Sequence, residues 1–320
     1  MHHPTRRRSR TTGARTAGTR TAGVLSAAGA LLATALLTPG TATAAPPRAV
    51  VVPCGAVLTT SVRLAADVDC PGGEGLTLAA DGIELNLNGH RLTGPGAAGG
   101  GVGVRVQAQG VTVRGGTVRG WGAGLDAGAD YDEGEPERPV SASVRAARFE
   151  GNGGAVTVGL GGGVVVRDTW FTGNRIAGSS IRGGQLIVER STADGNGEGF
   201  SSFEVEPGGL VLRESAVRRS RGSGVGCGQG GWVDLHRTSL QRNAVGVNAF
   251  QCTVRIQDSA FAWNGRHVQA SLVEWDVVAF RCTTFTADGG PLGVPLRPCH
   301  QPPGGSTAPG TRVTGTFDAL

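Results

Sequence analysis

Asp234 and His236 lie two residues apart in the run GWVDLHRTSL (residues 231–240). On a β-strand this spacing places both side chains on one face, about 6–7 Å apart. A carboxylate and an imidazole at that separation can act as general acid and base on a bound sugar. The two are therefore the candidate catalytic residues. The alternative interpretation is a pair of ordinary surface residues in charged columns.

Carboxylates cluster in the run DAGADYDEGEPERP, residues 126–139. Within it Asp130, Asp132 and Glu133 are the candidate metal ligands, because Ca²⁺ is bound by clustered carboxylate oxygens. The run lacks the spacing of an EF-hand loop, and an acidic run rich in Gly and Pro is also typical of a solvated insertion. Ca²⁺ is the one cofactor that the sequence suggests, with solvation as the alternative.

Polar and aromatic residues alternate in the runs GEGFSSFE (residues 197–204) and NAVGVNAF (residues 243–250). A polysaccharide site needs aromatic rings against sugar faces and amides or hydroxyls for its hydrogen bonds. The alternation predicts that such residues point outward, and Phe rings covered by neighbouring loops are the alternative. The candidate substrate-binding residues are Ser201, Phe203, Asn248, Phe250 and Gln269.

A repeat must position all of these residues. Nine apolar residues, the anchor column, recur at spacings of 26, 31, 22, 22, 24, 23, 21 and 24 residues, and a second apolar column stands five residues before each anchor. The anchors are Leu92, Val118, Phe149, Phe171, Ala193, Val217, Leu240, Phe261 and Phe285. The earlier column is Leu87, Val113, Val144, Val166, Val188, Leu212, Leu235, Ile256 and Phe280.

Period-2 apolar positions in short Gly-punctuated runs predict strands with one buried face, and the constant offset predicts that equivalent strands stack. The sequence holds 56 Gly, 16 Pro and no Lys, a composition that favours an all-β fold over long helices. Leucine-rich repeats share the period, but their signature is missing. We therefore expect a single-stranded right-handed parallel β-helix, a solenoid of about 9–10 coils of 21–26 residues.

Three further columns test this register. Asn at the position three after the anchor suits a turn, and its amide can bond the amide of the next coil. Residues three before the anchors alternate in charge, which would form ion pairs between stacked coils. The column three after the anchors is Asn152, Asn174, Asn196, Ser220, Asn243, Asn264 and Asp288. A column of small or hydroxyl residues two before the anchors is Ala147, Thr169, Ser191, Ser215, Thr238, Ser259 and Thr283. The charge column is Asp168, Arg190, Glu214, Arg237 and Asp258.

The chain resembles secreted bacterial proteins with right-handed β-helix repeats, of the pectin-lyase-like superfold. LNLNGHRLTG (residues 85–94) resembles their first coil, and CGAVLTTSVRLAADVDC (residues 54–70) resembles their N-terminal cap. The resemblance covers roughly residues 50–295 and is specific for fold. The superfold hosts lyases, hydrolases, epimerases and adhesins, so the fold alone does not assign an activity.

Motifs of the enzymatic branches are mostly missing. There is no adjacent Asp pair with Gly-His-Gly, no Asp-Pro-His and no Arg-x-Pro-x-x-Arg. Relative to the Trp-Ile-Asp-His run of pectate lyases, Leu235 is one extra residue before His236. The resemblance thus implies a protein that recognises, and in the enzymatic branches cleaves as a lyase or glycoside hydrolase, an acidic extracellular polysaccharide. The alternative is a non-catalytic structural or adhesive cell-wall protein.

The first 45 residues contain six Arg, no acidic residue, the apolar run 24–37 and then Ala42-Thr43-Ala44. This pattern predicts a signal peptide over residues 1–44, and the choice between twin-arginine and general export stays open. The remaining chain has 24 Arg against 25 acidic residues, since 30 less six is 24. That balance disfavours nucleic-acid binding, and no later run is long enough for a membrane helix. We expect a secreted, extracellular protein.

Six cysteines, all after residue 45, suggest disulfides in an oxidising compartment. Cys54 with Cys70 would staple an N-terminal cap, and Cys227 with Cys252 and Cys282 with Cys299 are the favoured remaining pairs among several. The expected organisation is a signal peptide (residues 1–44), an N-terminal cap with the first strands (45–84), the β-helix (85–299) and a C-terminal linker or tail (300–320).

Overall fold

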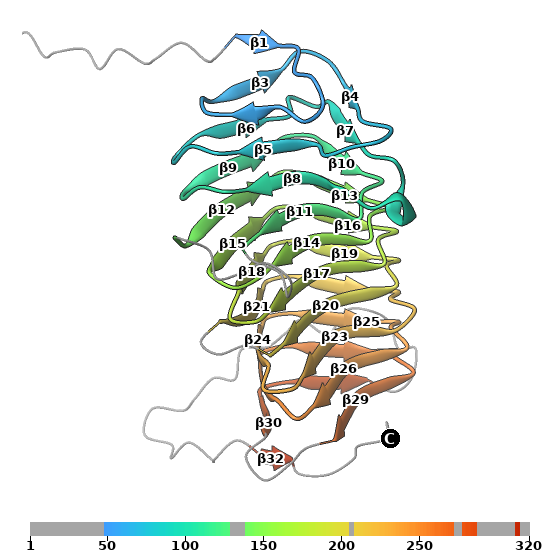
Figure 1. Cartoon of the computed structure of the whole chain (residues 1–320). Coiled ribbons are helices and arrows are strands. Elements are labelled where there is room, and N and C mark those ends of the chain that lie inside the picture. Colours follow the sequence, from blue (N-terminus) through green and yellow to red (C-terminus); the bar gives the residue numbers. More distant parts are fainter. Residues whose placement is uncertain (1–47, 129–137, 205–207, 272–276, 287–310, 314–320) are drawn as a thin grey trace, which may run out of the picture. The chain divides into compact units, whose positions relative to one another are not determined.

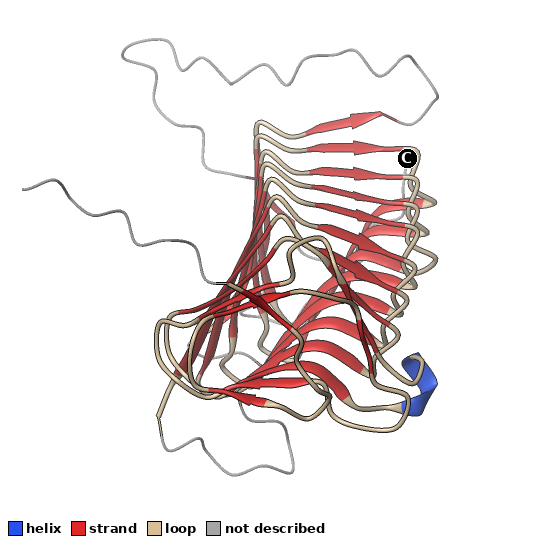
Figure 2. Cartoon of the chain, turned by 90° about the horizontal axis from the view of Figure 1, so that it is seen from above, coloured by secondary structure: helices blue, strands red, loops and turns tan. Residues whose placement is uncertain are grey.

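The structure is a computed structural model that describes residues 48–128, 138–204, 208–271, 277–286 and 311–313. They fall within one compact unit, residues 46–320. Three parallel β-sheets wind into a β-helix of about ten coils, in which each coil contributes one strand to each sheet (Figures 1 and 2). A single short 3-10 helix, η1 (Ala97–Gly99), interrupts the strands of the described part.

Three sheets, here named A, B and C, contain all described strands, and within each sheet neighbouring strands belong to successive coils. Sheet A contains β1 (Ala49–Val50), β3 (Val62–Leu64), β6 (Glu84–Asn86), β9 (Val111–Arg114), β12 (Val140–Arg145), β15 (Gly162–Arg167), β18 (Gln185–Glu189), β21 (Gly209–Arg213), β24 (Trp232–His236), β27 (Thr253–Gln257), β30 (Val277–Arg281) and the antiparallel β32 (Thr311–Val313). Sheet B contains β2 (Val57–Leu58), β5 (Leu76–Leu78), β8 (Val102–Val106), β11 (Ala123–Ala127), β14 (Gly154–Val158), β17 (Ile176–Ile181), β20 (Glu198–Phe203), β23 (Ser223–Gly228), β26 (Val245–Phe250) and β29 (Arg266–Ser271). Sheet C contains β4 (Val68–Asp69), β7 (Arg91–Thr93), β10 (Thr117–Arg119), β13 (Arg148–Glu150), β16 (Trp170–Thr172), β19 (Thr192–Asp194), β22 (Ala216–Arg218), β25 (Ser239–Gln241), β28 (Ala260–Ala262) and β31 (Thr284–Thr286).

The anchor column stacks in sheet C, and each anchor pairs in register with the next one, as the spacing predicted. From Leu92 to Phe261 the anchors are at most 1% exposed, and the rings of Phe149 and Phe171 stack with centroids 5.5 Å apart. Phe285 is 45% exposed because β31 is the last described strand of sheet C. The anchors therefore form one side of a continuous apolar core.

The register of the first coil differs from the prediction by two residues. Leu85, not Leu87, pairs with Val113 in sheet A. The turn between β6 and β7 is longer than in later coils, because Asn88 and Gly89 add two residues with φ of 53° and 83°. A shift of two residues keeps every side chain on its expected face, so Leu87 is still fully buried.

The Asn column forms a buried hydrogen-bonded ladder between sheets C and B. The Asn152 amide nitrogen donates to Asn174 Oδ1, and that of Asn174 donates to Asn196 Oδ1, each at 3.0 Å. Asn243 donates to Asn264 in the same way at 3.0 Å. Ser220 interrupts the ladder, and its buried hydroxyl has no hydrogen-bond partner. The predicted amide-to-amide bonding is thus confirmed on both sides of one gap.

The alternating charge column lies in the turn between sheets A and C, where its residues adopt left-handed φ values of 46–52°. Arg190 pairs with Asp168 at 2.9 Å, and Arg237 pairs with Glu214 at 2.9 Å. Asp258 instead faces the imidazole of His236. The predicted column therefore forms two exposed ion pairs rather than a continuous charge ladder.

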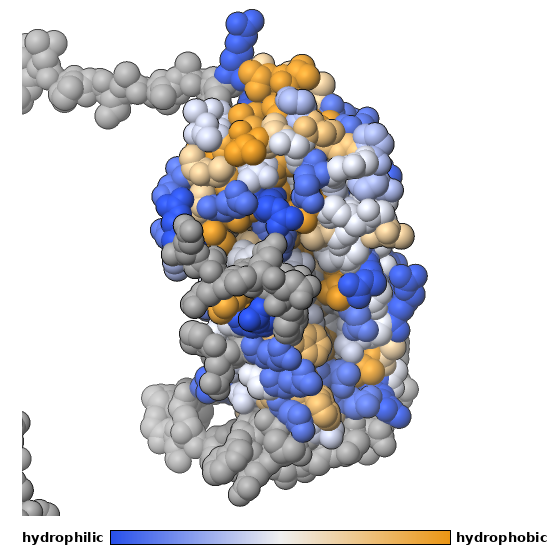
Figure 3. Space-filling model, viewed as in Figure 1, coloured by the Kyte–Doolittle hydropathy of each residue, from blue (hydrophilic) through white to orange (hydrophobic). Residues whose placement is uncertain are grey.

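Two of the predicted disulfides are present. Cys54 bonds Cys70, and Cys227 bonds Cys252. Cys282 is also disulfide-bonded, but Cys299 lies outside the described residues, so that pairing stays a prediction. Figure 3 shows apolar surface at the N-terminal end of the described β-helix, and Val51 and Val57 are exposed in its first strands and turns.

Candidate functional site

The outward face of sheet B brings four of the predicted substrate-binding residues together. Across β20, β23, β26 and β29, one outward column is Ser201, Gly226, Asn248 and Gln269. Two positions further along the strands, Phe203 pairs with Gly228, and Gly228 pairs with Phe250. The same-face placement follows from strand alternation, since Phe200 and Val247, each one residue before Ser201 and Asn248, point into the core.

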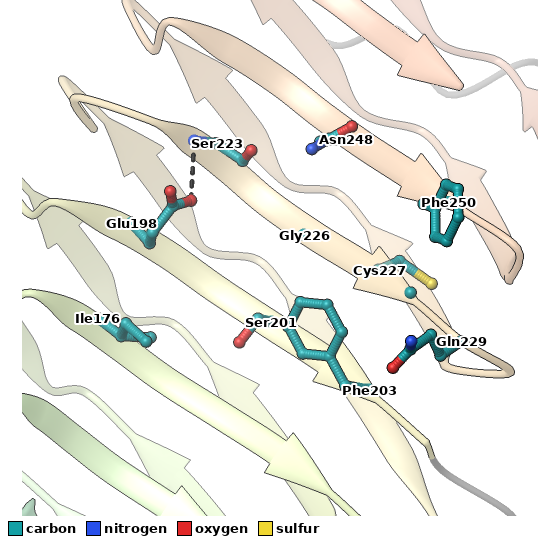
Figure 4. A pocket seen from close by; sticks show the side chains of 11 residues that line it. Ile176, Glu198, Ser201, Phe203, Ser223, Gly226, Cys227, Gln229, Asn248 and Phe250 are labelled. Carbon is teal, nitrogen blue, oxygen red and sulfur yellow. Dashed lines mark hydrogen bonds between the residues drawn. The ribbon is translucent and has the colours of Figure 1, made fainter. Parts of the chain in front are cut away.

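These columns enclose a cavity of about 490 Å³ (Figure 4). Ser201, Phe203, Asn248 and Phe250 line it, and the two Phe side chains are 38% and 47% exposed. The full lining consists of Ile176, Glu198, Ser201, Phe203, Ser223, Gly226, Cys227, Gly228, Gln229, Asn248 and Phe250.

Two glycines of β23 make the cavity possible. Gly226 and Gly228 stand at outward positions between side chains of the two flanking strands, so their coil contributes no side chain there. A Cβ at Gly228 would lie 2.9 Å from two atoms of the Phe203 ring, which therefore rests against the bare backbone. The disulfide of Cys227, a buried residue between them, ties this strand to the turn that follows β26.

Glu198 is the carboxylate of the cavity, and the sequence analysis did not single it out. Its Oε2 accepts a hydrogen bond from the backbone N–H of Ser223 at 2.9 Å (Figure 4). A Cβ at Gly222 would lie 2.2 Å from Glu198 Oε1, so the carboxylate occupies space that this glycine leaves open. Glu198 is the first residue of β20. A single Glu at the start of a strand matches no sequence motif, so the sequence analysis did not identify it.

Gln269 belongs to the same column but does not line the cavity. It lies one coil beyond Asn248, and its Oε1 accepts a hydrogen bond from Arg266 Nη1 at 3.0 Å. The structure therefore places four of the five predicted substrate-binding residues at one cavity and the fifth on the adjacent strand β29.

Asp234 and His236 lie on a different sheet. Both are half-buried on the outward face of β24 in sheet A, as their spacing predicted. His236 Nε2 lies 3.3 Å from Asp258 Oδ2, so the imidazole has a carboxylate partner from the next coil rather than Asp234. Asp234 stands beside Arg255 in the strand register. Neither residue lines the cavity on sheet B.

The predicted calcium ligands Asp130, Asp132 and Glu133 lie outside the described residues, and a Ca²⁺ site there stays a prediction. Within residues 48–128, 138–204, 208–271, 277–286 and 311–313, no group of three or more His, Cys, Asp or Glu side chains could hold a metal ion. In the same part of the chain, no helix is long and apolar enough to cross a membrane.

No protein-family model and no curated protein matches the chain. Among solved structures, the chain is similar to full-length tailspike protein 2 from Escherichia coli O157:H7 bacteriophage CAB120, with 12% identity and a TM-score of 0.30. The similarity covers 72% of this chain and 38% of the tailspike chain, so this chain spans well under half of the tailspike's length. The fold assignment rests on the sheets of the chain itself.

Proposed function

We propose that this protein binds an extracellular polysaccharide in the cavity on sheet B, without cleaving it there. The observation that carries the proposal is two half-exposed Phe rings facing a glycine floor, with Ser201 and Asn248 beside them. Sugar faces pack on aromatic rings, while hydroxyl and amide groups hydrogen-bond the sugar oxygens.

The cavity suits a short stretch of glycan chain rather than a single sugar. It follows β23 from Ser223 to Gly228, and five residue steps along a strand span roughly 16 Å. The strands run roughly perpendicular to the axis along which the coils stack. A glycan bound along β23 therefore also lies roughly perpendicular to that axis. Gln269, one coil further along that axis, then contributes little to binding.

Binding is favoured over cleavage by the number of carboxylates. Glycoside hydrolysis uses two carboxyl groups, whereas Glu198 is the sole carboxylate among the residues that line the cavity. An eliminating lyase needs a cation to neutralise the uronate, and the lining contains no Arg or His. Asp234 and His236 belong to sheet A and cannot complete a catalytic pair with Glu198.

The proposal includes secretion. Residues 1–44 have the charge and hydrophobicity pattern of a signal peptide. The described cysteines are all disulfide-bonded, which suits an oxidising compartment. The extracellular protein would then meet its glycan in a cell wall or capsule.

The test is binding of the secreted form, residues 45–320, to a panel of polyuronates and neutral glycans, with and without Ca²⁺, by affinity electrophoresis and calorimetry. A Phe203→Ala/Phe250→Ala double variant should lose about tenfold or more in affinity, because it removes both ring surfaces. Trp170→Ala, an equally exposed aromatic on sheet C, is the control and should bind normally.

Cleavage is followed in the same samples. The proposal predicts no new reducing ends and no ultraviolet absorbance of unsaturated uronate. Absorbance would identify a lyase, and reducing ends without absorbance would identify a hydrolase. If the wild-type protein binds no glycan, the proposal fails and a structural or adhesive wall protein becomes the better account.

A further inference from the structure

Among the described residues, Glu198 lacks the ion pair that several other carboxylates on the outward strand faces of the solenoid form. Asp126 pairs with Arg105 at 3.3 Å, and Glu189 pairs with Arg167 at 2.7 Å. Glu198 forms no ion pair with any residue in the described part of the chain; its hydrogen-bond donor is the Ser223 N–H. A half-buried carboxylate in the cavity therefore carries a charge that no protein cation balances.

The described residues around Glu198 position its carboxylate without supplying a cation. Arg175 and Arg221 enter from the turns before the two neighbouring strands, yet neither lies within ion-pair distance of Glu198 among the described residues. The Ser223 N–H binds Oε2, whereas Oε1 lies over Gly222 and accepts no hydrogen bond from the described protein groups. The glycine and the N–H fix the carboxylate, and one oxygen is left for a ligand.

We infer that Glu198 makes this cavity selective for uncharged sugars that offer hydroxyl donors, and that it excludes uronates. The inference rests on the proposed function and concerns the same site. It reverses, for this cavity, the acidic polysaccharide that the family resemblance implies.

The chemistry follows from what each ligand brings to the carboxylate. A sugar hydroxyl donates a charge-assisted hydrogen bond to Oε1, which is stronger than a neutral one. A uronate would instead place a second carboxylate beside the first, and like charges close together in a half-buried site repel each other. Ser201 and Asn248 supply neutral polar groups to either ligand, so they do not discriminate between the two.

The sharpest test compares each polyuronate with its carboxyl-reduced counterpart, in which the same linkages carry hydroxymethyl groups. Wild-type protein should bind the reduced polymer at least about tenfold more tightly. Glu198→Gln keeps the side-chain shape and an oxygen for the Ser223 N–H but removes the charge. In this variant the preference should fall to about threefold or less, because uronate binding is gained and neutral binding is weakened.

Glu150→Gln is the matched control, since it removes one negative charge from the outward face of sheet C, and it should keep the wild-type preference. A wild-type protein that binds uronates as tightly as the reduced polymers overturns the inference while the glycan-binding proposal stands. An unchanged preference in Glu198→Gln also overturns it. Absence of binding to every polymer, reduced or not, refutes the glycan-binding proposal itself.

Discussion

Replacing Asn174 by Ala should destabilise the protein more than any surface substitution of the same kind. Asn174 is fully buried in the amide ladder. Its Oδ1 accepts hydrogen bonds from the backbone and side-chain nitrogens of Asn152 at 2.9 and 3.0 Å. Its Nδ2 donates to the Phe149 carbonyl and to Asn196 Oδ1, both at 3.0 Å.

The variant loses all four of these hydrogen bonds and leaves the buried N–H of Asn152 without an acceptor. At about 1 kcal/mol for each bond, the free energy of unfolding should fall by about 4 kcal/mol. In a solenoid the loss acts on the interfaces between neighbouring coils, so the coils of Asn152 and Asn196 should loosen with it.

Guanidinium unfolding followed by far-ultraviolet circular dichroism measures the change, and hydrogen exchange locates it. Asn248→Ala is the control, because Asn248 is exposed and forms no side-chain hydrogen bond among the described residues. That control should change stability by no more than about 0.5 kcal/mol. A loss of less than about 1 kcal/mol in Asn174→Ala would refute the claim that the ladder stabilises the coils.

Two further predictions concern stability. Ser220→Asn should raise the free energy of unfolding by about 1 kcal/mol. The new amide fills the gap in the ladder between Asn196 and Asn243 and replaces a buried hydroxyl that has no hydrogen-bond partner. Thermal melting measures the change, and a lower melting temperature than that of the wild type would contradict this prediction. The hydrogen bond from Arg219 holds the pKa of the Asp194 carboxyl below its ordinary value of 3.8, so its stabilisation is present above that value and is lost as pH falls through the lowered pKa. Asp194→Asn should therefore flatten the acid limb of stability against pH, and an unchanged acid limb would contradict this.

Most of the fold could be predicted because the apolar columns recur at constant offsets from residue 111 onward. The Asn ladder was predictable for the same reason, since turn residues repeat with the strands they connect. The register predicted for the first coil was wrong by two residues because Asn88 and Gly89 lengthen its turn. A two-residue shift leaves the apolar pattern unchanged. Only the strand pairing separates the two registers.

The candidate site was predictable where a residue type has a chemistry of its own. Alternation along the strands identified Ser201, Phe203, Asn248 and Phe250. The cavity between them exists because Gly226 has no side chain to fill that space. A search for reactive residues cannot detect such a gap.

The sequence also did not predict which carboxylate lies beside His236. His236 was expected to act with Asp234, its neighbour on the strand, but its imidazole faces Asp258. That aspartate is in the left-handed conformation (φ 50°), in the turn after the next strand of sheet A. The turn geometry, which the residue spacing does not encode, brings the two together.

The central claim, a glycan bound on the floor formed by β23, is tested most directly by filling that floor. A Cβ at Gly226 would lie 3.6 Å from Ser201 Cβ and 3.9 Å from Phe203 Cζ, which are ordinary contacts, and its φ is not left-handed. Gly226→Val should therefore fold, since Val is favoured in strands, while its methyl groups occupy the cavity.

Gly163→Val is the matched control at an outward, open glycine on sheet A. Calorimetric titration with the tightest-binding glycan of the panel should show that Gly226→Val loses at least about tenfold in affinity at unchanged melting temperature. Gly163→Val should bind like the wild type. Wild-type affinity in Gly226→Val would contradict the account and place the glycan elsewhere on the protein.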